Sequence, residues 1–131
     1  MYKDKKIAVI GVSENTQKFG YRIFMDLLTA GFSVMAVGRG GNIRGIEIYK
    51  SLDALLSKPD LVITVVPPQV TEQIVKDCIR LNIKEIWCQP GSKSQIATQE
   101  AQKAGIKITI DECFMVSNGI WKGDSCVLPR K

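Results

Sequence analysis

The residues best placed to do chemistry in this chain directly follow its first apolar run. Residues 7–10 are all apolar, and Gly11, Val12 and Ser13 come next. An unbroken apolar run is typical of a parallel strand that is covered on both faces, and a glycine at its end permits a tight turn toward a helix N-terminus. The first N–H groups of a helix are unpaired and attract phosphate. We therefore expect a phosphate-binding turn at Gly11, Val12 and Ser13.

This turn satisfies only part of the glycine fingerprint of dinucleotide-binding proteins. The fingerprint reads G-x-G-x-x-G, whereas Ser13 occupies the second glycine position here and the next glycine is Gly20. A glycine turn without a ligand is therefore an alternative for this segment alone. Ser13 is a candidate both for a phosphate contact and for the N-cap of the following helix, since both roles use the same N–H groups. Lys18 is close enough along the chain to add a positive charge.

Arg39 bears on the choice of nucleotide. It follows Gly38 in a glycine-rich turn after the second apolar run. An NAD site usually has an acidic residue about 20 positions beyond the glycine turn, and no Asp or Glu stands between Leu27 and Ile46. Arginine instead suits a phosphorylated ribose, which both NADP and coenzyme A carry. NAD is therefore disfavoured, while a solvated arginine without a ligand is the alternative reading.

Apolar periodicity predicts that strands and helices alternate along the chain. The predicted strands lie near residues 6–10, 33–37, 60–66, 85–88 and 107–110, with 45–49 as either strand or loop, and the predicted helices span 18–30, 71–81 and 94–104, with a short one from 51 to 56. This alternation predicts a Rossmann-like α/β fold: an open parallel sheet of about five strands, in the order 3-2-1-4-5, with helices on both faces. Ligands of such sheets bind beyond the carboxyl ends of the strands. The segments predicted to end there are residues 11–13, 38–41, 66–68, 89–92 and 111–113.

The composition is that of a single domain. The chain has 131 residues, of which 45% are hydrophobic and 24% are charged, as in ordinary soluble globular proteins. No apolar run approaches the ~20 residues of a membrane span, and no signal-peptide pattern precedes the first strand. We therefore expect one domain over residues 1–131, a cytoplasmic location and no membrane partner. The net charge of +5 suits a small anionic ligand at least as well as nucleic acid, for which no recognition motif is visible.

Two residue types limit the chemistry. The chain contains no histidine, which excludes Ser-His-Asp and Cys-His catalysis, histidine acid–base chemistry and histidine-ligated metals. The cysteines show no C-x-x-C spacing, so a zinc or redox motif is not indicated. No catalytic residue and no metal ligand is therefore assigned.

A set of short segments in a fixed order carries a resemblance to a known family. They are residues 7–13, 31–34, 45–52, 60–63, 86–91, 104–106 and 111–113, and they include a W-x-Q-x-G element at 87–91 and a D-x-C element at 111–113. With these segments the chain resembles the small CoA-binding proteins, single-domain relatives of the CoA-binding domain in succinyl-CoA synthetase and ADP-forming acyl-CoA synthetases. The resemblance covers residues 6–113 and leaves 114–131 as an apolar tail.

The resemblance implies coenzyme A, or an acyl-CoA, as the ligand, with NADP as the second choice. The pyrophosphate would lie at the turn 11–13, helped by Lys18, and the adenine near the ends of the second and fourth strands. The segment 66–68 would form an apolar wall, and Gln89 and Gly91 would line the crevice further along. The candidate ligand-binding residues are Gly11, Val12, Ser13, Lys18, Gly38, Arg39, Val66, Pro67, Pro68, Gln89 and Gly91.

Three classes of function compete. A non-catalytic module that binds CoA or an acyl-CoA is the leading hypothesis. An NADP-linked oxidoreductase is an alternative, although the segment after residue 113 is too short for a substrate domain. An accessory subunit of an acyl-CoA ligase is another; the resemblance implies that such ligases pass phosphate through a histidine, which this chain lacks.

The last part of the chain is too apolar for a free end. Its apolar residues include Phe114, Met115, Val116, Ile120, Trp121, Val127 and Leu128. An exposed patch of this kind would be costly, so the tail is expected either to pack over the sheet or to form the interface of a homodimer. Trp87 lies inside a predicted strand and is expected to serve packing rather than ligand contact.

Overall fold

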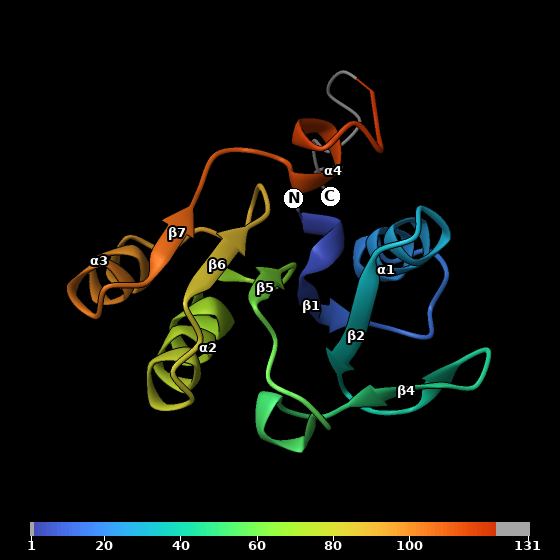
Figure 1. Ribbon diagram of the computed structural model, residues 1–131, viewed down its shortest axis with the longest axis horizontal. Helices are drawn as coiled ribbons and strands as arrows, with labels where there is room; N and C mark the ends of the chain where they lie inside the picture. Colours follow the sequence, from blue (N-terminus) through green and yellow to red (C-terminus); the bar gives the residue numbers. More distant parts are fainter. Residues whose placement is uncertain (1, 123–131) are drawn as a thin grey trace.

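A seven-stranded sheet forms the centre of the molecule (Figure 1). The computed structural model describes residues 2–122. The strands follow the order β3-β4-β2-β1-β5-β6-β7, and β3 is antiparallel to β4 whereas the other pairings are parallel. The strands are β1 (Lys6–Val12), β2 (Ser33–Gly38), β3 (Asn42–Ile43), β4 (Ile46–Tyr49), β5 (Leu61–Thr64), β6 (Glu85–Cys88) and β7 (Lys107–Thr109). The helices are α1 (Phe19–Thr29), α2 (Pro68–Arg80), α3 (Gln95–Lys103) and α4 (Phe114–Ser117), with 3-10 turns η1 (Tyr2–Asp4) and η2 (Leu52–Ala54).

The predicted Rossmann-like α/β architecture is confirmed. The predicted strand order 3-2-1-4-5 corresponds to β4-β2-β1-β5-β6 of the sheet. The number of strands is seven instead of about five: the segments predicted near 45–49 and 107–110 both form strands, β4 and β7, and the additional strand β3 folds back onto β4. Glycine and asparagine around β3 are typical of a turn, so the sequence did not predict this strand. Its buried Ile43, 4% exposed, anchors the hairpin in the core.

Two helical segments differ from their predicted bounds. α2 begins at Pro68, with Pro67 as its N-cap, instead of at residue 71. Proline suits the first turn of a helix because the N–H that it lacks has no partner there, so the two prolines that end β5 also start α2. The predicted helix from 51 to 56 is only the short turn η2, and the Ser51 side chain makes no capping hydrogen bond.

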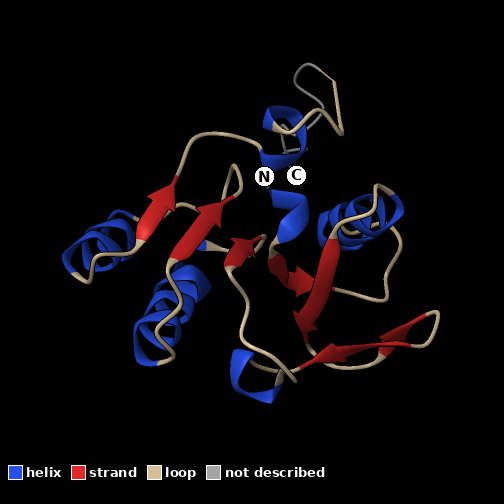
Figure 2. Cartoon of the chain, in the orientation of Figure 1, coloured by secondary structure: helices blue, strands red, loops and turns tan. Residues whose placement is uncertain are grey.

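Helices cover both faces of the sheet (Figures 1 and 2). α1 and α4 lie on one face, and α2 and α3 lie on the other. Because side chains alternate along a strand, β1 contributes Ile7 and Val9 to the core on the α1 face, and Ala8 and Ile10 to the core on the α2 face. The exposure of these four residues does not exceed 3%, which explains the unbroken apolar run in the sequence.

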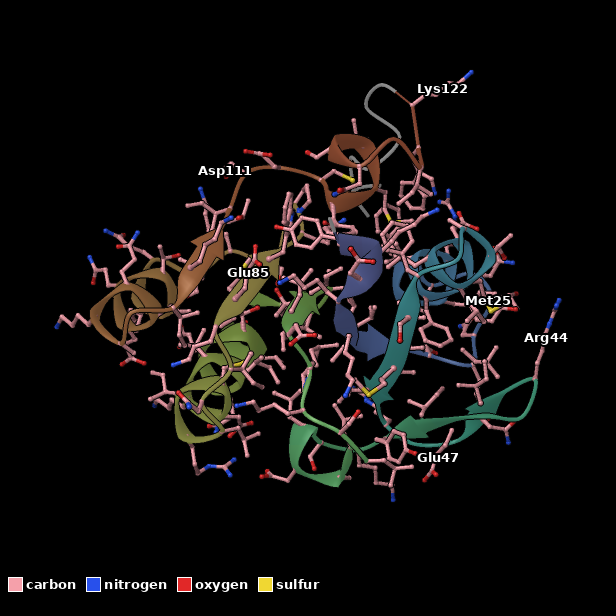
Figure 3. All side chains as sticks on the ribbon, in the orientation of Figure 1. Met25, Arg44, Glu47, Glu85, Asp111 and Lys122 are labelled. Carbon is pink, nitrogen blue, oxygen red and sulfur yellow. The ribbon has the colours of Figure 1, made fainter. Side chains whose placement is uncertain are left out.

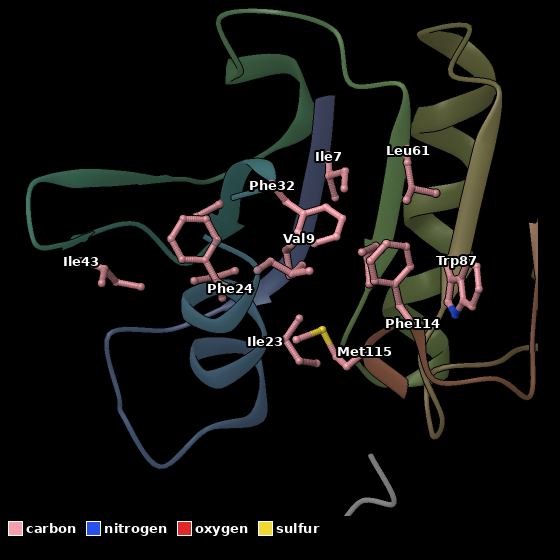
Figure 4. Packing of buried hydrophobic residues seen from close by; sticks show 14 of the residues in the cluster. Ile7, Val9, Ile23, Phe24, Phe32, Ile43, Leu61, Trp87, Phe114 and Met115 are labelled. Carbon is pink, nitrogen blue, oxygen red and sulfur yellow. The ribbon is translucent and has the colours of Figure 1, made fainter. Parts of the chain in front are cut away.

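An aromatic cluster fastens the segment after β7 to the sheet (Figure 4). Phe114 is fully buried and meets Tyr2, Phe32 and Trp87 edge to face, with ring centroids 5.2, 6.1 and 5.1 Å apart. Such pairs add to the stability that burial of apolar area provides. Trp87 is 6% exposed, so its predicted role in packing is confirmed.

The apolar tail packs over the molecule as far as it is described. Met115 is buried beside Phe114, and the Trp121 Nε1–H donates to Asp26 of α1 at 2.7 Å. Val127 and Leu128 lie outside the described residues, and the homodimer stays a prediction. Within residues 2–122, no helix has the length and apolar character that crossing a membrane requires.

Candidate functional site

Three chain segments press directly against the turn at the end of β1. Gly11 has a φ of +105°, and a methyl group on its Cα would overlap the carbonyl oxygen of Val65. A methyl group at Gly20 would overlap the carbonyl oxygen of Gly11, and one at Gly38 would overlap that of Val12. Only glycine permits such approaches. The end of β1 is therefore in backbone contact with the start of α1, the end of β2 and the segment after β5.

The loop between β1 and α1 explains why the glycine fingerprint is incomplete. α1 begins at Phe19 with Lys18 as its N-cap, so Gly20 lies in the first helical turn and takes the packing role of the third fingerprint glycine. The Ser13 hydroxyl accepts the N–H of Asn15 at 3.0 Å, inside the loop. The prediction that Ser13 caps the helix is therefore wrong, because residues 14–17 separate it from the N-cap. Its contact with phosphate stays a prediction.

Four of the predicted ligand-binding residues, Gly11, Val12, Gly38 and Val66, meet where β1 lies between β2 and β5. Val12 pairs with Gly38 across β1 and β2, and the Val65 N–H donates to the Ile10 carbonyl at 2.8 Å. The chain leaves β1 toward β2 on one side and returns to β5 on the other, which is the switch point where ligands of such sheets bind. Val66 is half-buried here, the Val12 side chain is buried and can offer only its backbone, and Lys18, Arg39, Pro67 and Pro68 are exposed.

Comparison with known families agrees with this geometry. Residues 5–119 match the family described as CoA binding domain. The chain belongs to this family. A conserved hypothetical protein from Pyrococcus furiosus is 36% identical, with a TM-score of 0.81 over 86% of this chain and 98% of that one. A hypothetical protein from Pyrococcus horikoshii OT3 is 27% identical, with a TM-score of 0.83 over 90% of this chain and 82% of that one.

Longer relatives, which are ADP-forming synthetases, match this chain over one of their domains. The alpha subunit of acetate–CoA ligase (ADP-forming) II from Pyrococcus furiosus is 28% identical over 129 residues, which cover 89% of this chain and 28% of the subunit. The chain thus spans less than a third of the length of that relative. The match shows homology with one domain of the ligase subunit. It does not extend to the activity of the whole ligase.

In this member of the CoA-binding domain family, buried side chains build the edge beyond β5. The Ser92 hydroxyl lies 2.6 Å from that of Thr64 and 2.7 Å from that of Thr71. The three residues are 2%, 0% and 0% exposed, so each hydroxyl depends on its neighbours for hydrogen bonds. They join the end of β5, the first turn of α2 and the loop after β6. The sequence analysis missed this triad, although a threonine that closes an otherwise apolar strand was a usable signal.

Gln89 has its side-chain amide turned toward the segment after β7. It is 1% exposed; its Oε1 accepts the Phe114 N–H at 2.7 Å, and its Nε2 donates to the Cys113 Sγ at 3.5 Å. Gln89 thus fastens residues 113 and 114 to the end of β6. Its predicted ligand contact stays a prediction, as does that of Gly91, which is exposed with a φ of +92°.

A glutamate that the sequence analysis did not consider reaches the turn after β2. The Glu14 Oε2 accepts the N–H of Asn42 at 2.9 Å. A methyl group at Gly41 would lie 2.5 Å from this oxygen, so the carboxylate lies directly over that glycine. Residues 28–45 contain no Asp or Glu, and the acidic group near the end of β2 comes from the loop after β1 instead.

Buried thiols and the opposite edge of the sheet offer less to a ligand. Burial raises the pKa of Cys78 to about 12 and also raises that of Cys88, so neither thiol is a ready nucleophile. A hollow of about 270 Å³ at the amino ends of the strands is lined by lysines, among them Lys58 and Lys84. Both lysines already donate to Asn82, and ligands of parallel sheets bind at the other edge. Within residues 2–122, no group of acidic or cysteine side chains is arranged to hold a metal ion.

Proposed function

We propose that the protein binds coenzyme A or an acyl-CoA at the carboxyl edge of the sheet, as a binding module without a reaction of its own. The observation that carries this proposal is the close backbone contact of Gly11 and Val12 with three neighbouring segments at the switch point. Membership of the CoA-binding domain family supports the choice of ligand. A glycine-lined turn of this kind lets a diphosphate approach the backbone closely.

The exposed cations suit the charge of the ligand. The diphosphate would lie at residues 11–13, with Lys18 at the start of α1 beside it. Arg39 would pair with the 3′-phosphate of CoA through charge-assisted hydrogen bonds. Val66, Pro67 and Pro68 would supply the apolar wall against which adenine or the pantetheine arm packs.

A thermal-unfolding comparison tests the ligand. CoA, acetyl-CoA, NADP and NAD are each added to the protein, and the free energy of unfolding is measured. A true ligand at 100 times its Kd should add about 2.7 kcal/mol. CoA and acetyl-CoA are expected to stabilise the protein, and NAD is not. Stabilisation by NADP without stabilisation by CoA would overturn the proposal.

A pair of arginine variants tests the site. Arg39→Ala should weaken CoA binding about tenfold and dephospho-CoA binding much less, because only CoA carries the 3′-phosphate. Arg44→Ala is the matched control, since Arg44 is an exposed arginine at the tip of the β3–β4 hairpin, where its side chain projects away from the sheet (Figure 3). Isothermal titration calorimetry measures both ligands. An equal loss for CoA and dephospho-CoA in Arg39→Ala would remove Arg39 from the 3′-phosphate.

A further inference from the structure

A carboxylate occupies the glycine turn at which the ribose end of the ligand would lie. The Glu14 Oε2 accepts the Asn42 N–H at 2.9 Å. A methyl group at Gly41 would lie 2.5 Å from Oε2 and 3.1 Å from Oε1. Both oxygens of Glu14 therefore lie over the backbone of Gly41, and any larger residue at that position would displace them.

The same turn carries positive charge. Arg39 precedes Gly40 and Gly41, and the aliphatic part of Lys50 lies over Gly40, with its Cε 2.9 Å from where a methyl group would stand. Glu14 reaches this turn from the loop after β1, a separation of 28 residues along the chain from Asn42. Lys50 and Glu14 thus lie over a turn of two glycines after β2, and Arg39 directly precedes that turn.

Glu14 has hydrogen-bonding capacity beyond the contact with Asn42. An ionised carboxylate offers about four lone-pair positions, and the Asn42 N–H uses one of them. The side chain is exposed, so a bound nucleotide can approach it. In dinucleotide sites an acidic side chain near the end of the second strand accepts hydrogen bonds from ribose hydroxyls. Glu14 brings a carboxylate to that place from a different loop.

We propose that Glu14 sets nucleotide specificity by accepting a hydrogen bond from the ribose 3′-hydroxyl, which is free in dephospho-CoA and phosphorylated in CoA. This assignment rests on the proposed function. A carboxylate attracts a hydroxyl and repels a phosphate, whereas Arg39 attracts the phosphate. The balance between Glu14 and Arg39 then decides how strongly the site prefers CoA, with its 3′-phosphate, over dephospho-CoA, in which both ribose hydroxyls are free.

The test compares two glutamate variants. Glu14→Gln keeps a side-chain carbonyl that accepts the Asn42 N–H but loses the charge. Glu47→Gln is the matched control, because Glu47 pairs with Asn42 in the hairpin register while its side chain projects outward from β4 (Figure 3). Calorimetry gives the Kd of CoA and of dephospho-CoA for the wild type and both variants. The ratio of the dephospho-CoA Kd to the CoA Kd should rise about tenfold in Glu14→Gln, since a charge-assisted bond is lost for one ligand and repulsion is relieved for the other.

Each outcome separates the two proposals. Binding of both ligands to Glu14→Gln with the wild-type ratio overturns the role of Glu14 and leaves the proposed function standing. An equal rise of the ratio in Glu47→Gln also overturns that role, because a general charge effect then accounts for it. Failure of the wild type to bind either ligand overturns the proposed function and, with it, the role of Glu14.

Discussion

The two halves of the carboxyl edge are built in opposite ways. Around the end of β1, backbone meets backbone at Gly11, Gly20 and Gly38, and exposed side chains stand around the turn. Beyond β5, the chain is joined by buried side chains, namely the Thr64, Thr71 and Ser92 hydroxyls and the amide of Gln89. The first half leaves backbone close to the surface for a ligand, whereas the second half satisfies its own polar groups. We infer that the second half acts as the rigid support against which the first half is positioned.

The largest effect is expected from Gly20→Ala, which disturbs the backbone contacts of Gly11, Gly20 and Gly38, here called the glycine half. The added methyl group would overlap the Gly11 carbonyl oxygen, so α1 must move away from β1. Overpacking of this kind should lower the free energy of unfolding by about 3 kcal/mol. Urea unfolding measures this free energy for the variant and the wild type.

The control for this prediction is Gly105→Ala. Gly105 has a φ of +79°, and a methyl group there meets no atom within 4 Å. Gly105→Ala therefore introduces backbone strain without an overlap, whereas Gly20→Ala introduces an overlap at a helical φ, and the control should lose only about 1 kcal/mol. Equal losses in the two variants would mean that close backbone contact does not distinguish the glycine half.

The sequence predicted the first half better than the second. Gly11 follows an apolar strand, and Gly38 follows the next one, so position along the chain was enough to bring both to the same edge. Gln89 was also placed at this edge, but its amide points to Phe114, a contact 25 residues away that no local pattern encodes. Glu14 was missed for the same reason, since its partner Asn42 begins β3, 28 residues further along the chain. Strand order follows from local periodicity, whereas side-chain direction depends on packing across the sheet.

A medium effect is expected from Ser92→Ala, which disrupts the buried hydroxyl contacts beyond β5, here called the hydroxyl half. The change removes the partner that the buried Thr64 and Thr71 hydroxyls share. Leaving buried hydroxyls without this bond should lower the free energy of unfolding by about 2 kcal/mol in urea unfolding. Ser117→Ala is the control, because Ser117 is exposed and bonds to Glu112 at 3.2 Å; it should lose less than about 0.5 kcal/mol.

A double-mutant cycle sharpens this prediction. Thr71→Val already removes one of the hydroxyls that Ser92→Ala would strand. The loss in the double variant should therefore be smaller than the sum of the single losses. If the losses in free energy of unfolding are strictly additive, the three hydroxyls do not act as a bonded unit. The second half would then not be the rigid support proposed above.

The smallest effect concerns the thiol of Cys78, which tests how dry the core under α2 is. Cys78 is fully buried on α2, and burial, followed by the charges of Asp77 and Cys88, raises its pKa from 9.0 to about 12. Above pH 9 the unfolded chain releases this proton while the folded chain retains it, so stability falls as pH rises toward 12. Between pH 8 and pH 10 this thiol should account for about 1 kcal/mol of the decrease in the free energy of unfolding. Cys78→Ala should show a correspondingly smaller decrease in urea unfolding at the two pH values, because the other titrating groups are common to both proteins. An equal decrease would mean that water reaches the thiol in the folded state, and the core under α2, on which the hydroxyl half rests, would not be sealed.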